Sequence, residues 1–525
     1  MQPSCIHQTE IPGTSRLFLD YLYHFDRVAQ FYQWPFSDLG ALADSAQAVQ
    51  YPEERRAKLI AALRKQNGDS AALARLAEAG TVAVVTGQQV GFLSGPEFTV
   101  FKALTAVKLA QHLNESGVPA APVFWAASED HDLAEVDHAW LFDQEGQPAK
   151  VSLAKAVSNG GPVGQVEFND VPLAELRAAL GELPFAEDII EKLGKWYRPG
   201  ATFGSAFVGF LQDLLRDFGI LFVDPLQPEI REIVSPMLRD TVAQAPDLTA
   251  ALRKRNEELV AAGYHAQVVV DEDASLLFLL AGNKRTAVRW KDGRFATKDG
   301  SYSPAELAAS AEKLSPNALL RPVIQDYLLP TVAYVAGPSE TAYMAQGQVL
   351  YEKLLGRMPV IFPRNSFTLL DDRCAKLMNR FELRLPDLLH HAEHVKSRIA
   401  AKLVPAHVLE SIAALRSGVR PQLEKVQSEL RRFDPTLEKA AEKSCAKITY
   451  QLQKLESKAA RETLRREQRA AQDAEYLINM VYPHRHLQER FYSIVPFLAK
   501  YGWDLPQRLF ESVQLTCPHH MVRSI

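Results

Sequence analysis

The hydrophobic pattern of residues 81–113 predicts a strand, a tight loop and a helix. Residues 82–85 form a short β-branched apolar run, which is typical of a buried strand. Apolar side chains then recur at roughly helical spacing, at Phe101, Leu104, Val107, Leu109 and Leu113. The turn between the two patterns is marked by Gly87, Gly91 and Gly95. Pro96 suits the first turn of the helix, because its missing N–H is not needed there.

A helix that begins at this loop would offer free backbone N–H groups and a positive dipole end to an anion. We therefore expect the segment to bind a phosphate or a carboxylate. The expected binding residues are Thr86, Gly87, Gln88, Gln89, Gly91, Gly95 and Lys102. The glycine spacing matches neither the dinucleotide fingerprint nor the Walker A loop. The pattern alone is equally consistent with glycines that only make a tight connection.

Further apolar runs extend the α/β pattern. Residues 121–127, 220–224 and 358–362 each predict a buried strand, and the first of these completes a parallel βαβ unit. Helical patterning precedes the first strand, over residues 16–80. Two insertions interrupt the alternation. Residues 143–200 are polar and glycine-rich, with a short strand expected at 165–168, whereas residues 264–302 carry the turn signals of a small antiparallel sheet.

From about residue 385 to 480 the chain consists of helix formers with mixed charge, and it predicts an antiparallel helical hairpin. One seam is spaced as in a heptad repeat with one stutter, at Leu437, Ala441, Ser444, Ile448, Leu452, Leu455 and Ala459. The partner seam runs from Val408 to Leu430 with an interruption near Pro421. Asp434 and Pro435 look like the start of a helix that continues past Leu477.

The predicted organisation is therefore a helical segment at 1–80, a core at 81–375, a helical hairpin at 385–480 and a return to the core at 481–525. The exposed seam of the hairpin favours a homodimer. The expected fold class is α/β, with a parallel-sheet core, connecting insertions and a long coiled-coil arm.

The composition of the chain limits the kinds of ligand and partner that we expect. Its 525 residues are 47% hydrophobic and 23% charged, which is ordinary for a folded protein. The net charge of −4 supplies no basic field for nucleic acid. The four cysteines are scattered, so free thiols in a reducing compartment are expected. We see neither a signal peptide nor a membrane span, and therefore expect a cytoplasmic protein that binds small molecules, without membrane or nucleic-acid partners.

Four polar residues directly follow the predicted strand at 121–127. They are Glu129, Asp130, His131 and Asp132. The carboxyl end of a strand is where open α/β sheets bind their ligands, so these residues are candidates for catalysis and for holding a polar substrate or nucleotide. A divalent metal and simple helix capping are the alternatives. Because no His pair with metal-ligand spacing is present, no metal site is predicted.

A second group of candidates lies further along the chain. Asn317, Arg321 and Gln325 are spaced by four and would share a helix face, although Pro322 would kink or break that helix. Arg321 is suited to clamp a carboxylate or phosphate, and the alternative is an interior salt bridge. Gly337 begins a turn that presents Glu340, as a ligand for an amino group, as a base or as a helix cap. Tyr343 and Arg364 complete the expected binding set.

Five segments in one order resemble a known family. They are TGQQVGFLSGPEFTVFKA, PVFWAASEDHDLAEVDH, SPNALLRPVIQDYLLPTVAYVAGPSETAYMAQ, FPRNSFTLLDDR and HLQERFYSIVPFLAKYG. Together they are similar to the BshC family, the cysteine-adding enzymes of bacillithiol biosynthesis. The resemblance runs from about Thr81 to the C-terminus and is thinner before it. A smaller residue than Val90, and often threonine in place of Ser94, would be typical of the family. Neither change removes a chemical group.

The resemblance implies a Rossmann-like core similar to that of class I aminoacyl-tRNA synthetases. It also implies a ligase that joins L-cysteine to glucosaminyl-malate. Because an amide does not form from a free carboxylate in water, ATP or another activating nucleotide is expected, with Mg²⁺ as its companion and no tightly bound cofactor. Arg321 is the expected ligand of the malate carboxylate. The alternatives are a synthetase-like nucleotide-binding protein or a coiled-coil interaction protein without ligase activity.

Overall fold

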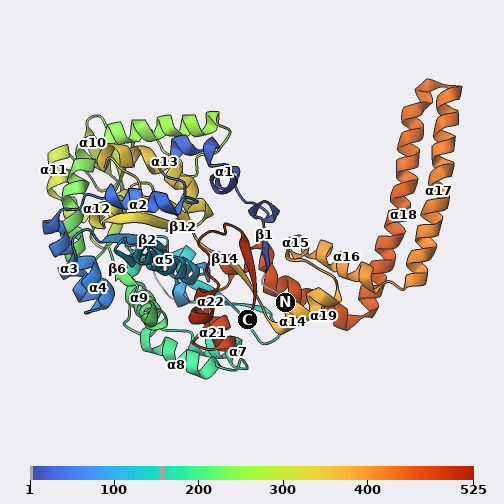
Figure 1. Cartoon of the computed structure of the whole chain (residues 1–525), viewed down its shortest axis with the longest axis horizontal. Helices are drawn as coiled ribbons and strands as arrows, with labels where there is room; N and C mark the ends of the chain where they lie inside the picture. The colour runs from blue at the N-terminus through green and yellow to red at the C-terminus, as the bar shows by residue number, and fades with distance from the viewer. Residues whose placement is uncertain (1–3, 154–159) are drawn as a thin grey trace.

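A parallel five-stranded sheet forms the centre of the molecule (Figure 1), in a computed structural model that describes residues 4–153 and 160–525. Its strands are β2 (Val82–Gln89), β3 (Ala120–Ala127), β6 (Leu221–Val223), β12 (Thr331–Ala336) and β13 (Val360–Pro363). Their order is β13-β12-β2-β3-β6, and every neighbouring pair is parallel. All four strands expected from the apolar runs are present. The chain leaves β2 for β3 on one side and later returns to β12 on the other, which is the Rossmann-like switch in strand order.

The sheet is buried on both faces, as parallel sheets are. Successive side chains of β3 point to opposite faces, so Phe124 and Ala126 join one hydrophobic cluster while Val123 and Trp125 join another. Helix α5 (Phe98–Glu115) connects β2 to β3 and packs against both strands. The predicted strand, loop and helix are therefore present, but β2 extends to Gln89, so Gly87 lies in the strand and not in the turn.

The N-terminal region is helical, as predicted, and it packs on the sheet. Its helices are α1 (Arg16–Tyr23), α2 (Leu39–Gln47), α3 (Glu53–Asn67) and α4 (Ala71–Ala77), with short 3-10 turns at Gln8–Glu10, Phe25–Arg27 and Ala29–Phe31. The hydroxyl of Tyr21 donates to the carbonyl oxygen of Ile361, and Tyr32 donates to Thr341 at 2.7 Å. These bonds attach the first helices to β13 and to the helix after β12.

The segment between β3 and β6 is partly helical. It contains α6 (Leu133–Val136), β4 (His138–Phe142), β5 (Pro148–Ser152), a 3-10 turn (Val163–Gln165), α7 (Leu173–Leu180), α8 (Ala186–Trp196), α9 (Phe203–Leu214) and a 3-10 turn (Arg216–Phe218). The strand expected at 165–168 is wrong, because only Glu167 makes a bridge there, to Thr202. Residues 154–159 of the predicted insertion lie outside the described ranges.

The second insertion is the antiparallel sheet that the sequence predicts. It consists of β7 (Ala274–Ala281), β8 (Lys284–Lys291), β9 (Arg294–Thr297), β10 (Gly300–Tyr302) and β11 (Leu314–Pro316), in the order β10-β9-β8-β7-β11. Around it lie α10 (Pro228–Ala261), α11 (Pro304–Ala309), a 3-10 turn (Ala311–Lys313), α12 (Arg321–Leu328) and α13 (Pro338–Leu354). Helix α12 begins at Arg321 with Pro322 in its first turn, so it does not extend back to Asn317 and contains no kink.

A long helical hairpin projects from the core on the right of Figure 1. Its two helices are α17 (Ala406–Phe433) and α18 (Glu438–Arg466), with a 3-10 turn (Pro435–Leu437) between them and α16 (Ala392–Leu403) and α19 (Gln468–Val481) at the base. Asp434 caps the turn as predicted. Helix α17 is continuous through Pro421, and the second helix ends at Arg466 instead of continuing past Leu477. No helix of the described ranges is long and apolar enough to cross a bilayer.

The C-terminal segment returns to the core, as expected. It contains a 3-10 turn (Pro483–Arg485), α20 (Gln488–Phe491), α21 (Val495–Tyr501) and α22 (Leu505–Glu511). Two short helices precede the hairpin, α14 (Asp372–Arg380) and α15 (Leu385–Leu388). A small sheet that the sequence did not predict joins the chain ends, in the order β1-β15-β14. Its strands are β1 (Ser4–Ile6), β14 (Ser366–Leu370) and β15 (His520–Ser524).

Candidate active site at the switch point

A cavity of about 540 Å³ opens where the strand order changes direction, between the carboxyl ends of β2 and β12. Open α/β sheets bind their ligands at this position. The volume is within the usual range for small-molecule sites, which is about 300–1,000 Å³. The walls come from the ends of β2, β3 and β12, the first turns of α5, α12 and α13, and the antiparallel insertion.

A buried ion pair lies at the base of the cavity. Lys102 of α5 contacts Glu340 of α13 at 2.5 Å and donates to the carbonyl oxygen of Gly87 at 2.8 Å. Glu340 also accepts hydrogen bonds from the backbone N–H of Gly337 and from the hydroxyl of Tyr334. Burial opposes ionisation of Glu340, but the Lys102 charge and these hydrogen bonds outweigh it and lower its pKa. Glu340 therefore caps α13 and is a charged part of the cavity wall.

Arg321 lies in the cavity without a carboxylate partner among the described residues. Its guanidinium donates to Gln325 at 2.9 Å, to the Tyr334 hydroxyl at 3.1 Å and to the Tyr343 hydroxyl at 3.3 Å. These three partners are neutral and fix the direction of the side chain. The positive charge is therefore available to an anion, and the interior salt bridge considered for Arg321 is not present in the described ranges.

The end of β3 contributes two carboxylates to the cavity. Glu129 forms an ion pair with Arg231 at 2.8 Å, and burial nevertheless raises its pKa. Asp130 accepts a hydrogen bond from Gln89 at 2.6 Å. Although burial opposes it, this bond and the Arg285 charge lower the pKa of Asp130. The two neighbouring residues therefore differ in acidity.

His131 and Asp132, the other two of the four polar residues that follow the strand, lie away from the cavity. Both are exposed and do not line it. The His131 ring is 3.0 Å from Arg285, which does reach the cavity. No group of three or more His, Cys, Asp or Glu side chains in residues 4–153 and 160–525 is arranged to hold a metal ion.

The glycine loop differs from the expected anion cradle. The hydroxyl of Thr86 is buried and donates to the carbonyl oxygen of Val335, while Gly91 and Gly95 lie against each other away from the cavity. The start of α5 is covered by the C-terminal segment, because Pro96 pairs with Ser493. Only Gly87, Gln88, Gln89 and Lys102 of the expected set line the cavity.

The structure explains the residue type at two of the expected positions, Gly87 and Asn317. A side chain at Gly87 would lie 2.8 Å from the carbonyl oxygen of Trp125, so the two strands require glycine there. Asn317 precedes α12 instead of sharing its face, and its side chain accepts from the backbone N–H groups of Leu319 and Leu320. Both residues still line the cavity.

Comparison with known proteins identifies the family. The family model of the N-terminal Rossmann-like domain of bacillithiol biosynthesis BshC matches residues 1–365, and that of the BshC C-terminal coiled-coil domain matches residues 367–524. The chain belongs to the BshC family. Its relatives include proteins named "Putative cysteine ligase BshC" from Solibacter usitatus, at 50% identity over 99% of both chains, and from Koribacter versatilis, at 37% identity over 99% of both. The similarity thus begins at residue 1, earlier than the sequence motifs indicated.

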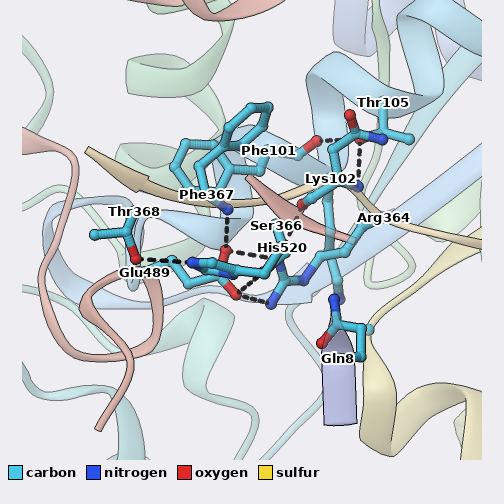
Figure 2. Close-up of polar contacts among 12 residues, drawn as sticks. Gln8, Phe101, Lys102, Thr105, Arg364, Ser366, Phe367, Thr368, Glu489 and His520 are labelled. Carbon is cyan, nitrogen blue, oxygen red and sulfur yellow. Dashed lines mark hydrogen bonds and ion pairs between the residues drawn. The ribbon is translucent and has the colours of Figure 1, made fainter. Parts of the chain in front are cut away.

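The predicted fold class is confirmed by this comparison and by the structure, since a BshC Rossmann-like domain and a BshC coiled-coil domain follow one another. The cavity nevertheless draws on both domains. Arg364 is in the first, and its guanidinium makes a two-pronged ion pair with Glu489 of the second, at 2.7 and 3.0 Å. Figure 2 shows the Glu489 carboxylate between Arg364 and the backbone N–H of Phe367. Although burial opposes it, the Arg364 charge lowers the pKa of Glu489.

A buried histidine completes the contacts around Glu489 in this BshC chain. His520 of β15 lies 2.6 Å from the Ser366 hydroxyl and 2.8 Å from the Thr368 hydroxyl (Figure 2). Ser366 in turn donates to Glu489 at 2.8 Å. Burial lowers the pKa of His520 to about 4, with Glu489 opposing and Arg364 adding to the shift. The ring is therefore neutral near pH 7.

His520 should make the protein sensitive to acid. Its pKa is about 4 in the folded protein and 6.5 for a solvent-exposed histidine, so the unfolded chain binds the proton more tightly. The neutral His520 ring therefore contributes fully to the free energy of unfolding above pH 6.5. As the pH falls towards 4, this free energy decreases by about 3 kcal/mol. Glutamine keeps a polar side chain but does not titrate. Between about pH 7.5 and 4.5 we therefore expect the free energy of unfolding, measured in urea, to decrease less in His520→Gln than in the wild type. Equal losses in the two proteins would contradict this assignment.

Some residues of the BshC cavity carried no signal in the sequence. Arg285 reaches it from β8 of the antiparallel sheet, stacked 3.9 Å above Phe278. Tyr334 lies in an apolar run that is typical of core, yet its hydroxyl contacts both Glu340 and Arg321. Only the pairing of distant segments brings these side chains together.

Charge in the BshC cavity is opposite in sign to the charge of the whole chain. The cationic side chains on its wall are Lys102, Arg285, Arg321, Arg364 and Arg490, and the carboxylates are Glu129, Asp130 and Glu340. Five cations and three anions leave a formal charge of +2, whereas the whole chain carries −4. The cavity is therefore suited to an anionic ligand.

Proposed function

We propose that this protein is a ligase that joins the carboxylate of L-cysteine to the amine of glucosaminyl-malate, which forms the amide of bacillithiol. The observation that carries this proposal is the match of both BshC domains over nearly the whole chain. Two relatives covered over 99% of their length are named as cysteine ligases. The cationic cavity at the switch point supports it, because both substrates carry carboxylates.

The reaction requires an activating nucleotide, for which ATP is our proposal. When bound, it would convert the cysteine carboxylate into a group that an amine can displace. The cavity suits such a ligand, since Arg285, Arg321 and Arg490 are cationic and Phe98 and Trp125 provide apolar surface. Any Mg²⁺ would depend mainly on phosphate oxygens, because the described residues hold no cluster of metal ligands.

The side chains of the cavity divide into cationic and acidic groups with different tasks. Arg321 would bind and orient a carboxylate, because its neutral partners hold it in place without neutralising it. Asp130 would hold a substrate ammonium or hydroxyl group. Glu129 is suited to accept the proton that the attacking amine loses, since its raised pKa lies closer to neutrality. Preorganised charges of this kind are the expected main source of rate.

A reconstituted reaction tests this function. Purified protein is incubated with L-cysteine, glucosaminyl-malate and ATP, and the thiol product is identified by mass spectrometry. We expect bacillithiol only when all three are present. Folded protein that makes no product under these conditions would contradict the proposal.

We also propose that the arm mediates a homodimer. Large hydrophobic side chains are exposed on the hairpin, namely Leu415, Val426, Phe433, Ile448, Tyr450 and Leu455. Such residues along two long helices are typical of an interaction surface.

The four cysteines are all free, which supports our placing the protein in the cytoplasm.

Placing positive charge among the exposed hydrophobic side chains of the hairpin should dissociate the homodimer. We expect the double variant Leu415→Lys and Ile448→Lys to elute as a monomer in size-exclusion chromatography with light scattering, because lysine in an apolar contact is strongly unfavourable. The matched control is Leu173→Lys, an exposed leucine of the core. A wild-type monomer, or a dimer that survives the double substitution, would contradict the proposal.

A further inference from the structure

A second cavity of about 400 Å³ adjoins the first and shares part of its wall. The shared residues are Pro338, Ser339, Arg364 and Arg490. The remaining walls come from residues 8–18 of the N-terminal region, from His265 and Gln267, from residues 363–366, from residues 482–490 of the C-terminal return and from Pro518. Parts of the chain that are distant in sequence therefore meet here.

Two arginines of this cavity have no ion-pair partner in the described ranges. The side chains of Arg485 and Arg490 are exposed and make no hydrogen bond or ion pair with any residue in 4–153 or 160–525. The Arg490 guanidinium lies 5.8 Å from the centre of the Phe98 ring, and Glu489 and Glu340 are the carboxylates whose charges act on it. The one carboxylate on the described wall is Glu489, which is already bound to Arg364. Since Arg364 and Glu489 neutralise each other, the cavity keeps a formal charge of +2 from Arg485 and Arg490.

We propose that this second cavity binds the dicarboxylate end of the amine substrate, an inference that rests on the proposed function. Two guanidinium groups that form no ion pair with the described residues match two carboxylates, which arginine binds through paired hydrogen bonds. The rest of the substrate extends past Ser339 into the first cavity. The amine then meets the activated carboxylate of cysteine in front of Arg321. This arrangement differs from the sequence-based expectation that Arg321 itself binds the malate.

Phosphate groups of the nucleotide share this chemistry, because they are also dianions. The wall of the second cavity favours the dicarboxylate. Its aromatic side chains are Phe18, Tyr482 and the polar rings of His265 and His486, whereas Phe98 and Trp125, which offer a flat apolar surface to a base, line the first cavity. A nucleotide in the first cavity and a dicarboxylate in the second would bring both reacting groups to the shared wall.

Isothermal titration calorimetry with the full-length protein tests this inference. The ligands are glucosaminyl-malate, L-malate, inorganic phosphate and ATP, each titrated separately. The variants are Arg485→Gln, Arg490→Gln and the double substitution, with Arg239→Gln as a control of equal charge change. Arg239 is exposed on α10 and lines neither cavity. Because Arg485 and Arg490 make no hydrogen bonds through their side chains to the described residues, their variants should unfold at the wild-type temperature.

We expect Arg485→Gln and Arg490→Gln each to weaken the binding of glucosaminyl-malate and of L-malate by about tenfold or more. Arg239→Gln should bind both ligands with wild-type affinity. ATP affinity should change less than twofold in Arg485→Gln. Unchanged glucosaminyl-malate affinity in the double variant would overturn the inference, as would a loss confined to ATP or phosphate. If the variants lose dicarboxylate binding but the wild type makes no amide, the proposed function fails and the site stands. If the variants form amide with an unchanged KM for the amine, the site fails and the function stands.

Discussion

Substituting Arg321 with methionine should lower kcat/KM for amide formation by about two to three orders of magnitude. The reason is that a charged group that binds a carboxylate within a cavity contributes about 2–5 kcal/mol. Methionine keeps much of the length and apolar stem but not the charge. Because the partners of Arg321 are the neutral groups of Gln325, Tyr334 and Tyr343, its loss leaves no buried charge behind. The fold should therefore persist.

The control for this experiment is Arg55→Met. Arg55 stacks 3.6 Å above the Tyr327 ring and lines neither cavity. We expect it to retain wild-type activity, measured as initial rates at varied cysteine and glucosaminyl-malate. Equal activity of Arg321→Met and wild type, or an Arg321→Met protein that does not fold, would contradict a direct role for Arg321.

Substituting Glu489 with glutamine should destabilise the protein by about 3–5 kcal/mol, because it leaves the buried Arg364 charge uncompensated. Glu489 is 1% exposed and Arg364 is 8% exposed, so bulk water screens the unpaired charge poorly. The free energy of unfolding in urea measures the effect. The same variant should bind ligands in the first cavity less tightly, since Glu489 fixes the direction of the Arg364 guanidinium.

A neighbouring glutamate supplies the matched control. Glu97 is fully buried, and both carboxylate oxygens lack a hydrogen-bond partner among the described residues. Burial, with the Glu489 charge adding to it, raises the pKa of Glu97 well above its usual value, which favours the neutral form. Glu97→Gln therefore replaces a carboxyl group that burial shifts towards neutrality with a neutral amide, and should alter stability by less than about 1 kcal/mol. Similar losses in the two variants would contradict the assigned charge states.

Periodicity predicted four of the five strands of the parallel sheet and the helical hairpin, but not β12 (Thr331–Ala336). The buried strands β2, β3, β6 and β13 each appear as apolar runs, and the seam of the hairpin appears as a heptad spacing. Local chemistry also located the caps, as at Asp434. The small sheet β1-β15-β14 escaped prediction because a three-residue strand leaves no periodic signal and its partner lies at the other end of the chain.

The candidate site was harder to predict than the fold, for physical reasons. Glu129, Asp130 and Arg321 were expected from strand ends and spacing, and they do line one cavity. Thr86 was expected beside them because a loop was assumed where β2 continues, and its hydroxyl is instead used inside the sheet. Arg285 depends on the placement of a whole antiparallel sheet, which no local pattern specifies.

The measurement that most directly tests the central claim follows the carboxylate oxygens of cysteine. The protein is incubated with L-cysteine labelled with ¹⁸O at both carboxylate oxygens, together with glucosaminyl-malate and ATP, and the products are analysed by mass spectrometry. If the chain activates the carboxylate and then joins it to the amine, one ¹⁸O remains in the amide of bacillithiol and the other appears in the phosphate-containing product. Folded protein that yields no bacillithiol, or bacillithiol without ¹⁸O transfer to phosphate, would contradict the account.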